Sequence, residues 1–348
     1  MVEWRSSRIV RPLLLAAVVL AFLLALAGGS AAMLAAPQQS ARQISDQLLY
    51  RAVAADVARG ASYYDSAIAR QRAWNYPVRP FVTVRMPVLA GVQARLGDAG
   101  LRILAGIAAL ALFPLWMHRL KGRAFTLRLA AIMAMVATAL PLVFSPFIYF
   151  HDYWAGLMLA FAIALHPARW RAGVATLAAL IRELTAPFLA IEAAVTLMRS
   201  RPILAAPALG GLILIAGILA LHAWAVWSRT SPADLASAGW SGLRGPAGVV
   251  GDIAGLTVLQ FLPFPLAAAL VFLPLLGWCE FDDGGTALCW FGFFLCAIAL
   301  LARADNSYWA ANVLPAYFAG LAFVPAFFRN LGANRSASAR ASSTQPAR

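Results

Sequence analysis

Carboxylates and arginines recur in this chain at the ends of long uncharged runs. A carboxylate can take a proton from a hydroxyl group, and an arginine can bind a phosphate oxygen through charge-assisted hydrogen bonds. Together they supply the groups that a transfer from a phosphate to a hydroxyl requires. The residues that we expect near one boundary of the apolar runs are Asp56, Asp65, Asp152, Glu183, Asp305, Arg79, Arg85 and Arg182.

Each of these charges also has a purely structural interpretation. Asp65 lies three residues after Ser62, which is the spacing of a helix capping box. Asp56 ends an amphipathic stretch, where it is either a solvated charge or a base. Arg79 and Arg85 can bind the phosphate of a substrate or anionic lipid headgroups, or they can only anchor their segment at the interface.

Arg182 and Glu183 interrupt an otherwise apolar stretch, where a charge is costly unless it faces a partner or water. Neighbouring side chains on a helix point about 100° apart, so this pair does not easily neutralise itself. Each residue should therefore meet a partner on another helix or in a cavity. An interhelical ion pair without a substrate role is the alternative.

Further polar and aromatic residues accompany the charges. They bind a substrate, or they belong to the interface between membrane and water, where tyrosine is enriched. These residues are Tyr63, Tyr64, His151, Asn306 and Tyr308. The four histidines have no cysteine or second histidine at ligand spacing, so no zinc-type cluster is visible, and a divalent cation stays possible but unassigned.

The composition excludes a water-soluble globular protein. Of 348 residues, 62% are hydrophobic and 12% are charged, whereas soluble domains carry about 25% charged residues. A net charge of +14 would suggest nucleic acid as the partner of a soluble protein. Here the arginines flank apolar runs, so we expect membrane lipids and no nucleic acid as partners.

Uncharged runs near the length of a spanning helix, about 20 residues, predict the elements that position these side chains. Seven such runs are residues 12–36, 103–117, 129–150, 202–228, 253–278, 286–302 and 306–328. Residues 153–198 are interrupted twice, and we interpret them as three short or tilted segments. The sequence thus predicts an all-α transmembrane bundle of about ten segments in one domain, residues 1–333, and a disordered tail, residues 334–348.

Basic residues in the short loops predict the orientation. They precede the first run and follow alternate runs, which places both termini in the cytoplasm of a multi-pass protein of the cell (inner) membrane. Residues 37–100 then form one large external loop. Its pattern predicts an amphipathic helix that ends near Gly60, a second helix from Ser62 to about Ala73, and a stretch rich in proline that excludes a continuous helix.

This arrangement resembles the GT-C superfamily of integral-membrane glycosyltransferases, which use polyprenyl-phosphate sugars as donors. The matching segments are residues 56–65 (DVARGASYYD), 76–81 (YPVRPF) and 84–87 (VRMP), with weaker matches at 151–156 (HDYWAG), 181–184 (IREL) and 305–309 (DNSYW). The resemblance implies a GT-C-like fold and sugar transfer to a glycan or lipid acceptor of the cell envelope. It implies Asp56 as the base that activates the acceptor, with the donor phosphate bound by Arg79, Arg85 and Arg182.

Two other classes of function compete with a transferase. A secondary transporter or lipid flippase predicts broken helices in corresponding halves and ionisable groups near the middle of the membrane, but the sequence contains no internal repeat. A non-catalytic membrane scaffold needs no external cluster of acids and arginines.

Overall fold

The computed structural model describes residues 9–34, 36–144, 146–281 and 284–343, and in these ranges the chain forms helices and loops without a strand. The predicted all-α class is therefore confirmed for the described residues. The longer helices are α1 (Val10–Leu34), α2 (Ala36–Ala58), α3 (Tyr63–Ala73), α4 (Pro87–Arg119), α5 (Phe125–Phe144), α6 (His151–Ala164), α7 (Ala168–Ile181), α8 (Ala186–Met198), α9 (Pro202–Trp227), α10 (Gly245–Gly255), α11 (Phe264–Trp278), α12 (Gly284–Leu301) and α14 (Val324–Ser343). Short helical turns are η1 (Phe81–Thr83), η2 (Pro146–Tyr149), η3 (Glu183–Thr185), η4 (Val258–Phe261), η5 (Ala304–Asn312), α13 (Leu314–Tyr317) and η6 (Phe318–Phe323).

Fewer helices are long enough to cross a membrane than the sequence predicts. The described residues contain three such helices, Val10–Gly29, Phe81–Arg119 and Pro202–Trp227. A broken pair, Ala304–Asn312 and Leu314–Ala333, bends by 49° and adds a fourth if it counts as one span. The count is therefore three to four by length and composition, where the uncharged runs predict about ten.

The difference arises because several uncharged runs contain a break. Run 253–278 contains the end of α10, then η4, and then α11. At the break between α10 and η4, the hydroxyl of Thr257 accepts a hydrogen bond from the Leu259 amide at 3.3 Å. Helices α6, α7 and α8 have 14, 14 and 13 residues. At 1.5 Å per residue each is roughly 20 Å long, which is less than the roughly 30 Å of a hydrocarbon core. An uncharged run alone does not set the length of a helix.

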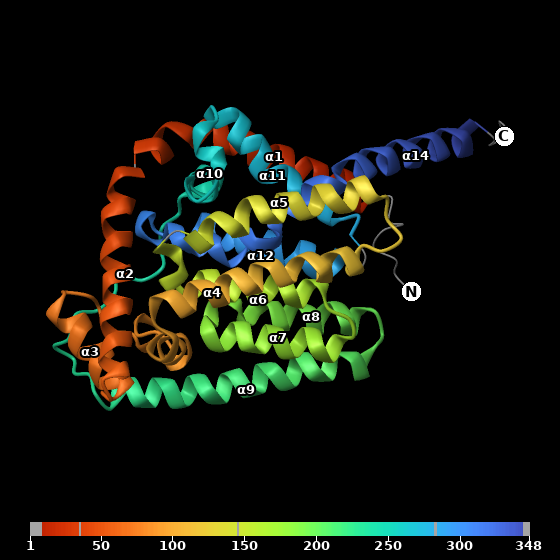
Figure 1. Ribbon diagram of the computed structural model, residues 1–348. Helices are drawn as coiled ribbons and strands as arrows, with labels where there is room; N and C mark the ends of the chain where they lie inside the picture. Colours follow the sequence, from red (N-terminus) through yellow and green to blue (C-terminus); the bar gives the residue numbers. More distant parts are fainter. Residues whose placement is uncertain (1–8, 35, 145, 282–283, 344–348) are drawn as a thin grey trace.

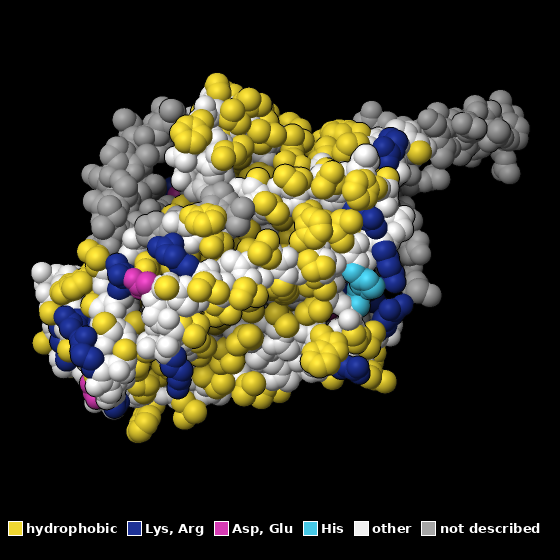
Figure 2. Space-filling view, viewed as in Figure 1, with side chains coloured by type: hydrophobic (Ala, Val, Ile, Leu, Met, Phe, Trp, Pro, Cys, Tyr) yellow, Lys and Arg dark blue, Asp and Glu magenta, His cyan; other side chains and the backbone are white. Residues whose placement is uncertain are grey.

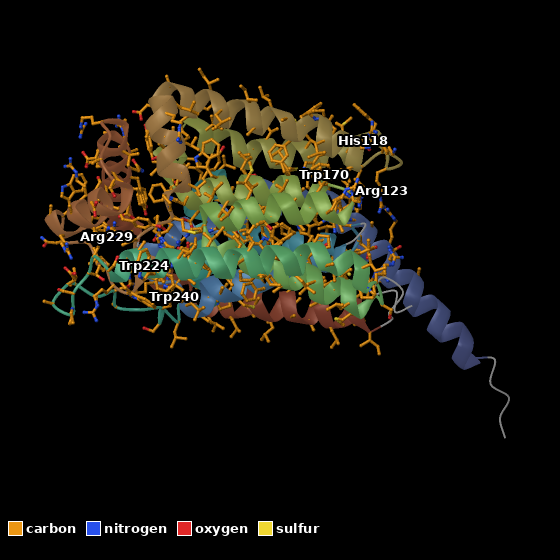
Figure 3. All side chains as sticks on the ribbon, turned by 90° about the horizontal axis from the view of Figure 1, so that it is seen from below. His118, Arg123, Trp170, Trp224, Arg229 and Trp240 are labelled. Atoms are coloured by element: carbon orange, nitrogen blue, oxygen red, sulfur yellow. The ribbon has the colours of Figure 1, made fainter. Side chains whose placement is uncertain are left out.

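The bundle has two distinct ends. The long helices run side by side, with α2 and α3 across one end and the turn between α4 and α5 at the other (Figure 1). In Figure 2 hydrophobic side chains cover the middle of the visible face, while Lys and Arg gather toward both ends. Figure 3 labels Trp224, Arg229 and Trp240 at the α2–α3 end and His118, Arg123 and Trp170 at the α4–α5 end. An apolar belt between two charged ends is typical of a membrane protein.

Buried ion pairs join distant helices. The Nε atom of Arg11 in α1 donates to Glu280 at 2.7 Å, and Asn330 of α14 donates to the same carboxylate at 2.7 Å. Arg171 of α7 pairs with Glu192 of α8 at 2.9 Å. Charged groups inside apolar surroundings need such partners, so these pairs fix how the helices assemble.

Glycines bring the last third of the chain against the middle of the bundle. A Cβ atom at Gly156 of α6 would lie 2.1 Å from the carbonyl oxygen of Ala311, and one at Gly277 of α11 would lie 1.7 Å from that of Gly320. Only glycine permits these distances. As a result η5 and η6 pack directly on α6 and α11, which places residues 304–312 beside the start of α6.

Residues 36–86 contain α2, α3 and an extended connection. Gly60, with φ of +93°, turns the chain between the two helices. Ser62 is the N-cap of α3, but its side chain makes no capping hydrogen bond. Asp65 instead accepts a hydrogen bond from Arg229 at 2.8 Å. The spacing of the two residues thus marks the start of the helix without the predicted capping box.

A second loop, residues 228–244, lies against this connection, and we call it the strap. Arg72 of α3 pairs with Asp234 at 2.7 Å, and this guanidinium lowers the pKa of the Asp234 carboxyl to about 2. The amide of Val78 donates to the carbonyl of Leu235 at 3.1 Å. The strap therefore rests on the large loop along part of its length.

Helix α14 continues to Ser343, whereas the composition predicts disorder from residue 334 onward. Alanine and arginine are favourable residues in a helix, and both are frequent in this segment. The low apolar content that indicates disorder does not prevent helix formation here. Residues 344–348 of the predicted tail lie outside the described residues.

Candidate functional site

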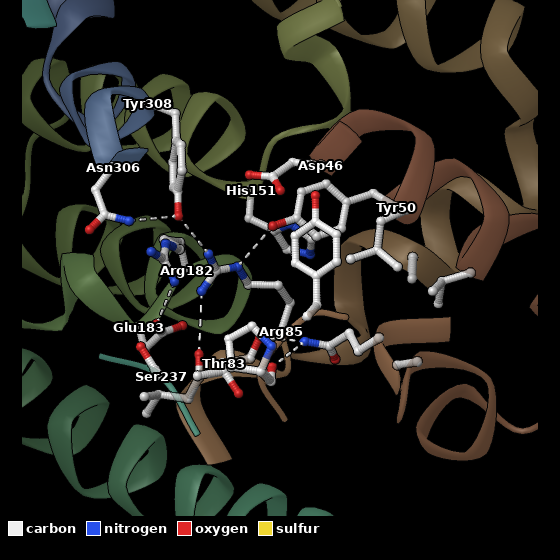
Figure 4. Close-up of a pocket in the computed structure, with 18 of the residues that line it drawn as sticks. Asp46, Tyr50, Thr83, Arg85, His151, Arg182, Glu183, Ser237, Asn306 and Tyr308 are labelled. Carbon is white, nitrogen blue, oxygen red and sulfur yellow. Dashed lines mark hydrogen bonds and ion pairs between the residues drawn. The ribbon is translucent and has the colours of Figure 1, made fainter. Parts of the chain in front are cut away.

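An open cavity lies at the α2–α3 end, with about 1030 Å³ of empty space when its mouth to solvent is included, and we call it the pocket. Its wall combines residues of α2, α3 and the strap with residues at the ends of α6, α7 and α12. Figure 4 shows part of this wall. Its charged, histidine and amide side chains are Asp46, Gln71, Arg85, Gln93, His151, Arg182, Glu183, Arg303, Asp305 and Asn306. Its larger aromatic side chains are Tyr50, Tyr63, Tyr76, Trp240, Tyr308 and Trp309.

Arg85 enters the pocket from the segment just before α4. Its guanidinium donates to the hydroxyl oxygens of Tyr50 and Tyr308 at 3.3 and 3.2 Å, and to the carbonyl of Val82 at 3.3 Å. No carboxylate among the described residues forms an ion pair with it. A cation that the protein shields from water is costly without an anionic partner. Arg85 is therefore positioned to bind an anion that enters the pocket.

Arg182 is deeply buried and paired on two sides. Its Nε atom donates to Asp152 of α6 at 3.0 Å, and its Nη1 atom donates to Glu183 at 2.6 Å. Asn312 donates to the same oxygen of Asp152 at 2.7 Å. The prediction that Arg182 and Glu183 do not pair with each other is wrong, because α7 ends at Ile181 and Arg182 has an extended backbone. The predicted partner on another helix is Asp152.

Three buried side chains of the pocket wall carry polar atoms without a hydrogen-bond partner among the described residues. These atoms are Nε2 of Gln93, both ring nitrogens of His151 and Nε1 of Trp309. The three side chains are only 6%, 3% and 3% exposed. Because buried polar groups are nearly always paired, this group indicates a polar ligand. Amide and indole N–H groups donate, so the ligand should present oxygen acceptors.

Turn η5 brings the predicted segment 305–309 into the pocket. Asp305 accepts two hydrogen bonds from Arg303 at 3.1 and 3.0 Å. The amide of Asn306 donates to the hydroxyl of Tyr308 at 3.3 Å, and this hydroxyl also accepts from Arg85. The turn thus connects one paired arginine, Arg303, with the unpaired Arg85.

Asp56, the predicted base, does not line the pocket. Its carboxylate accepts hydrogen bonds from Arg70 at 2.7 and 2.8 Å and from Ser66 at 2.7 Å, and it also pairs with Arg59. The hydrogen bonds from Arg70 and Ser66 hold the pKa of this carboxyl well below its usual range. Such a carboxylate accepts a proton poorly. Its evident role is to join α2 to α3.

Arg79 and Tyr64 also lie outside the pocket wall. The Arg79 guanidinium donates to the carbonyls of Ser231 and Pro232 in the strap. The Tyr64 hydroxyl lies 3.1 Å from Nδ1 of His222. Asp152 lies behind the wall, where it holds Arg182. The predicted residues that the pocket does bring together are Tyr63, Arg85, His151, Arg182, Glu183, Asp305, Asn306 and Tyr308.

The sequence did not identify several residues of the wall, among them Asp46, Tyr50, Gln93, Trp240 and Arg303. Asp46 and Tyr50 are four residues apart, so they share one face of α2. Their spacing of four residues indicates from the sequence alone that both side chains lie on the same face of a helix. Trp240 and Arg303 have no such signal, because only the folded strap and the end of α12 bring them to the pocket.

The described residues contain no group of three or more His, Cys, Asp or Glu side chains that could hold a metal ion. The divalent cation that the sequence leaves possible thus has no ligand set in the described part of the chain. Accordingly we assign no chemical step to a metal.

Comparisons of the chain with protein-family models, with curated proteins and with solved structures gave no match. The resemblance to the GT-C superfamily therefore rests on the sequence pattern.

We expect Asp56→Asn to lower the unfolding temperature at pH 7 by a few degrees, because it removes the ion pair with Arg70. The pKa of Asp56 is lower in the folded chain than in the unfolded chain, where it is about 3.9. The ion pair therefore stabilises the fold above about pH 4, and this contribution is lost as the pH falls further. The difference between variant and wild type should begin to narrow below about pH 5 and should continue to narrow below about pH 3, because the pKa of Asp56 in the folded chain lies well below its usual range.

Thermal unfolding of both proteins in detergent, followed by circular dichroism, measures this difference. Asp65→Asn is the matched control, because the Asp65 side chain is exposed and its ion pair with Arg229 is screened by solvent. Equal unfolding temperatures for Asp56→Asn and the wild type at pH 7 would show that this ion pair does not hold α2 to α3.

Proposed function

We propose that this protein is a membrane glycosyltransferase of the GT-C type. It moves a sugar from a polyprenyl-phosphate donor to a glycan or lipid acceptor of the cell envelope on the external face of the membrane. The observation that carries the proposal is the unpaired Arg85 guanidinium in a pocket whose wall also holds unpartnered hydrogen-bonding groups. A ligand that joins an anion to a group rich in hydroxyls would pair its anion with Arg85 and offer its hydroxyl oxygens to the unpartnered groups.

The donor phosphate binds at Arg85 in this proposal. Arg182 lies close enough for the two positive charges to act on each other, so both contribute to the potential at the phosphate. Glu183 and Asp152 hold Arg182 in place. The geometry does not favour Arg79 for this role, because strap carbonyls already occupy its guanidinium.

Asp46 takes the place of Asp56 as the base. Its side chain lines the pocket and is 7% exposed. Figure 4 shows it beside His151 and on the far side of Arg85 from Glu183. Glu183 accepts a hydrogen bond from Arg182 at 2.6 Å and Asp305 accepts one from Arg303 at 3.0 Å, so both carboxylates position arginines of the pocket.

The reaction forms one bond and breaks another. The acceptor oxygen bonds to the anomeric carbon of the sugar, and the bond from that carbon to the phosphate oxygen breaks with its electron pair on the phosphate. The proton of the acceptor hydroxyl moves to the Asp46 carboxylate. Arg85 stabilises the charge that develops on the departing phosphate.

A second, open cavity beside the pocket offers a path for the lipid chain of the donor. It shares Tyr63 with the pocket and is otherwise lined by Val57, Ala58, Pro87, Gly91, Ala94 and Arg95. Its lining is mostly small and apolar, which suits an isoprenoid chain. It opens between the end of α2 and the first part of α4, which a backbone break at Gly97, with φ of +64°, separates from the rest of that helix.

We expect the two ends of the bundle to react with a label from opposite sides of the membrane. Ser62→Cys, at the α2–α3 end, should react with a membrane-impermeant maleimide in intact cells. Lys121→Cys, in the turn after α4, should react only after permeabilisation, because the excess of basic residues places that end in the cytoplasm. Both substitutions are made in a background in which Cys279, Cys289 and Cys296 are replaced by alanine. The reverse labelling pattern would overturn the orientation.

Arg85→Ala should weaken the binding of undecaprenyl phosphate by about tenfold or more, because one charge-assisted hydrogen bond contributes about 1.5–3 kcal/mol. Arg85→Lys should restore part of the affinity, since it keeps the charge without the planar guanidinium. Microscale thermophoresis of the purified protein gives the dissociation constants. Arg79→Ala is the control, and its affinity should match that of the wild type. A larger loss for Arg79→Ala than for Arg85→Ala would place the phosphate elsewhere.

Asp46→Asn should lower the rate of sugar transfer by about 10²–10⁴, the usual cost of losing a general base, while donor binding persists. Asp56→Asn should transfer sugar at close to the wild-type rate. Radiolabelled polyprenyl-phosphate sugar and a lipid acceptor in proteoliposomes provide the assay. Full activity of Asp46→Asn would exclude it as the base. Movement of intact donor across the bilayer without transfer would favour the transporter alternative.

A further inference from the structure

Trp240 is a half-exposed tryptophan on a polar loop, and it lines the pocket. Its side chain is 48% exposed. Its ring stands at 84° to the ring of Trp309, with 6.0 Å between the centroids. An indole face that is open toward a polar cavity can cover the apolar face of a flat ligand.

The backbone that carries Trp240 is held on both sides. The carbonyl of Gly239 accepts a hydrogen bond from Arg303 at 3.2 Å, and the amide of Leu243 donates to Leu300 at 3.1 Å. A Cβ atom at Gly242 would lie 1.8 Å from the carbonyl oxygen of Ala302, so only glycine allows the strap to sit against the end of α12. The indole is therefore placed before a ligand arrives, which lowers the entropic cost of binding.

Trp309 provides a second and independent indication of a ligand. It is 3% exposed, it lines the pocket, and its indole N–H has no acceptor among the described residues. The indole nitrogen can only donate. An acceptor oxygen on a bound ligand would satisfy this group.

We propose that Trp240 and Trp309 form a subsite for the pyranose ring of a sugar. The inference rests on the proposed function and deepens it, since it names the ring form of the transferred group. A pyranose presents C–H groups on one face and hydroxyl oxygens around its edge. Trp240 covers the apolar face, and the N–H of Trp309 donates to a hydroxyl oxygen.

Exposed tryptophans also occur at membrane interfaces, and the same end of the molecule contains an example. Trp224 lies in α9, is 68% exposed and does not line the pocket (Figure 3). Trp240 contributes to the pocket wall, whereas Trp224 does not. Trp224 therefore serves as the matched control for the proposed sugar contact.

The test compares undecaprenyl phosphate with undecaprenyl-phosphate glucose and undecaprenyl-phosphate mannose as probes. Trp240→Ala should weaken the binding of at least one sugar-bearing probe by about tenfold, as expected for a central tryptophan contact. Its affinity for the sugar-free lipid should stay within about twofold of the wild type. Trp240→Phe should keep most of the affinity for the sugar-bearing probe, and Trp224→Ala should match the wild type with every probe. Trp309→Phe, which removes only the N–H, should cause a several-fold loss that again depends on the sugar.

An equal loss for sugar-bearing and sugar-free lipid in Trp240→Ala would overturn the subsite, and so would no loss at all. A second arm uses methyl α-glucoside and methyl α-mannoside at millimolar concentrations, with binding followed by saturation-transfer NMR. If the wild type binds none of the three lipid probes but binds a glycoside through Trp240, the proposed transferase function fails while the sugar subsite stands. If donor binding depends on Arg85 but no probe distinguishes Trp240→Ala from the wild type, the subsite fails and the proposed function stands.

Discussion

The apolar surface of the long helices is the constraint on which the rest of this structure depends. Polar groups between these helices must find a partner inside the protein or move to one end of the bundle. Arg11 with Glu280 and Arg171 with Glu192 meet this requirement as buried pairs. Some buried polar atoms have no such partner among the described residues, and those of Gln93, His151 and Trp309 lie in the pocket wall.

The pocket depends on contacts between segments that lie far apart in the chain. Gly156 lets η5 pack on α6, so Tyr308 reaches the guanidinium of Arg85 across more than 200 residues of sequence. The strap rests on the large loop through Arg72 and on the end of α12 through Leu243. A rigid bundle thus supplies the floor of the pocket, and two loops supply its outer wall. This division is common where loops that are held by a scaffold carry the functional groups.

Composition and apolar runs were sufficient to predict helices with membrane-spanning character, since both depend on local properties of the chain. They were insufficient for the number of spans, because breaks such as Thr257 act inside runs that contain no charge. They also placed Asp56 in the site, although Arg70, fourteen residues later, holds its carboxylate. The turn at Gly60 creates that contact, and no periodicity in the sequence reveals it. Trp240 was missed for the same reason, since tertiary contacts alone bring the strap to the pocket.

The proposed donor carries one negative charge, and the pocket contains one arginine that could pair with it. Arg303 pairs with Asp305, and Arg182 pairs with both Asp152 and Glu183, which leaves Arg85 as the cation of the pocket without an ion pair among the described residues. A polyprenyl-phosphate sugar is a phosphodiester with a single charge, so one guanidinium suffices to neutralise it. Transfer of the sugar converts this phosphate into a monoester with a charge near −1.5 to −2. In the proposed reaction the additional negative charge appears as Asp46 gains a proton, so the total charge of the pocket stays the same. A base inside the pocket therefore avoids the cost of separating charge in surroundings of low dielectric constant, whereas a base at the position of Asp56 would not.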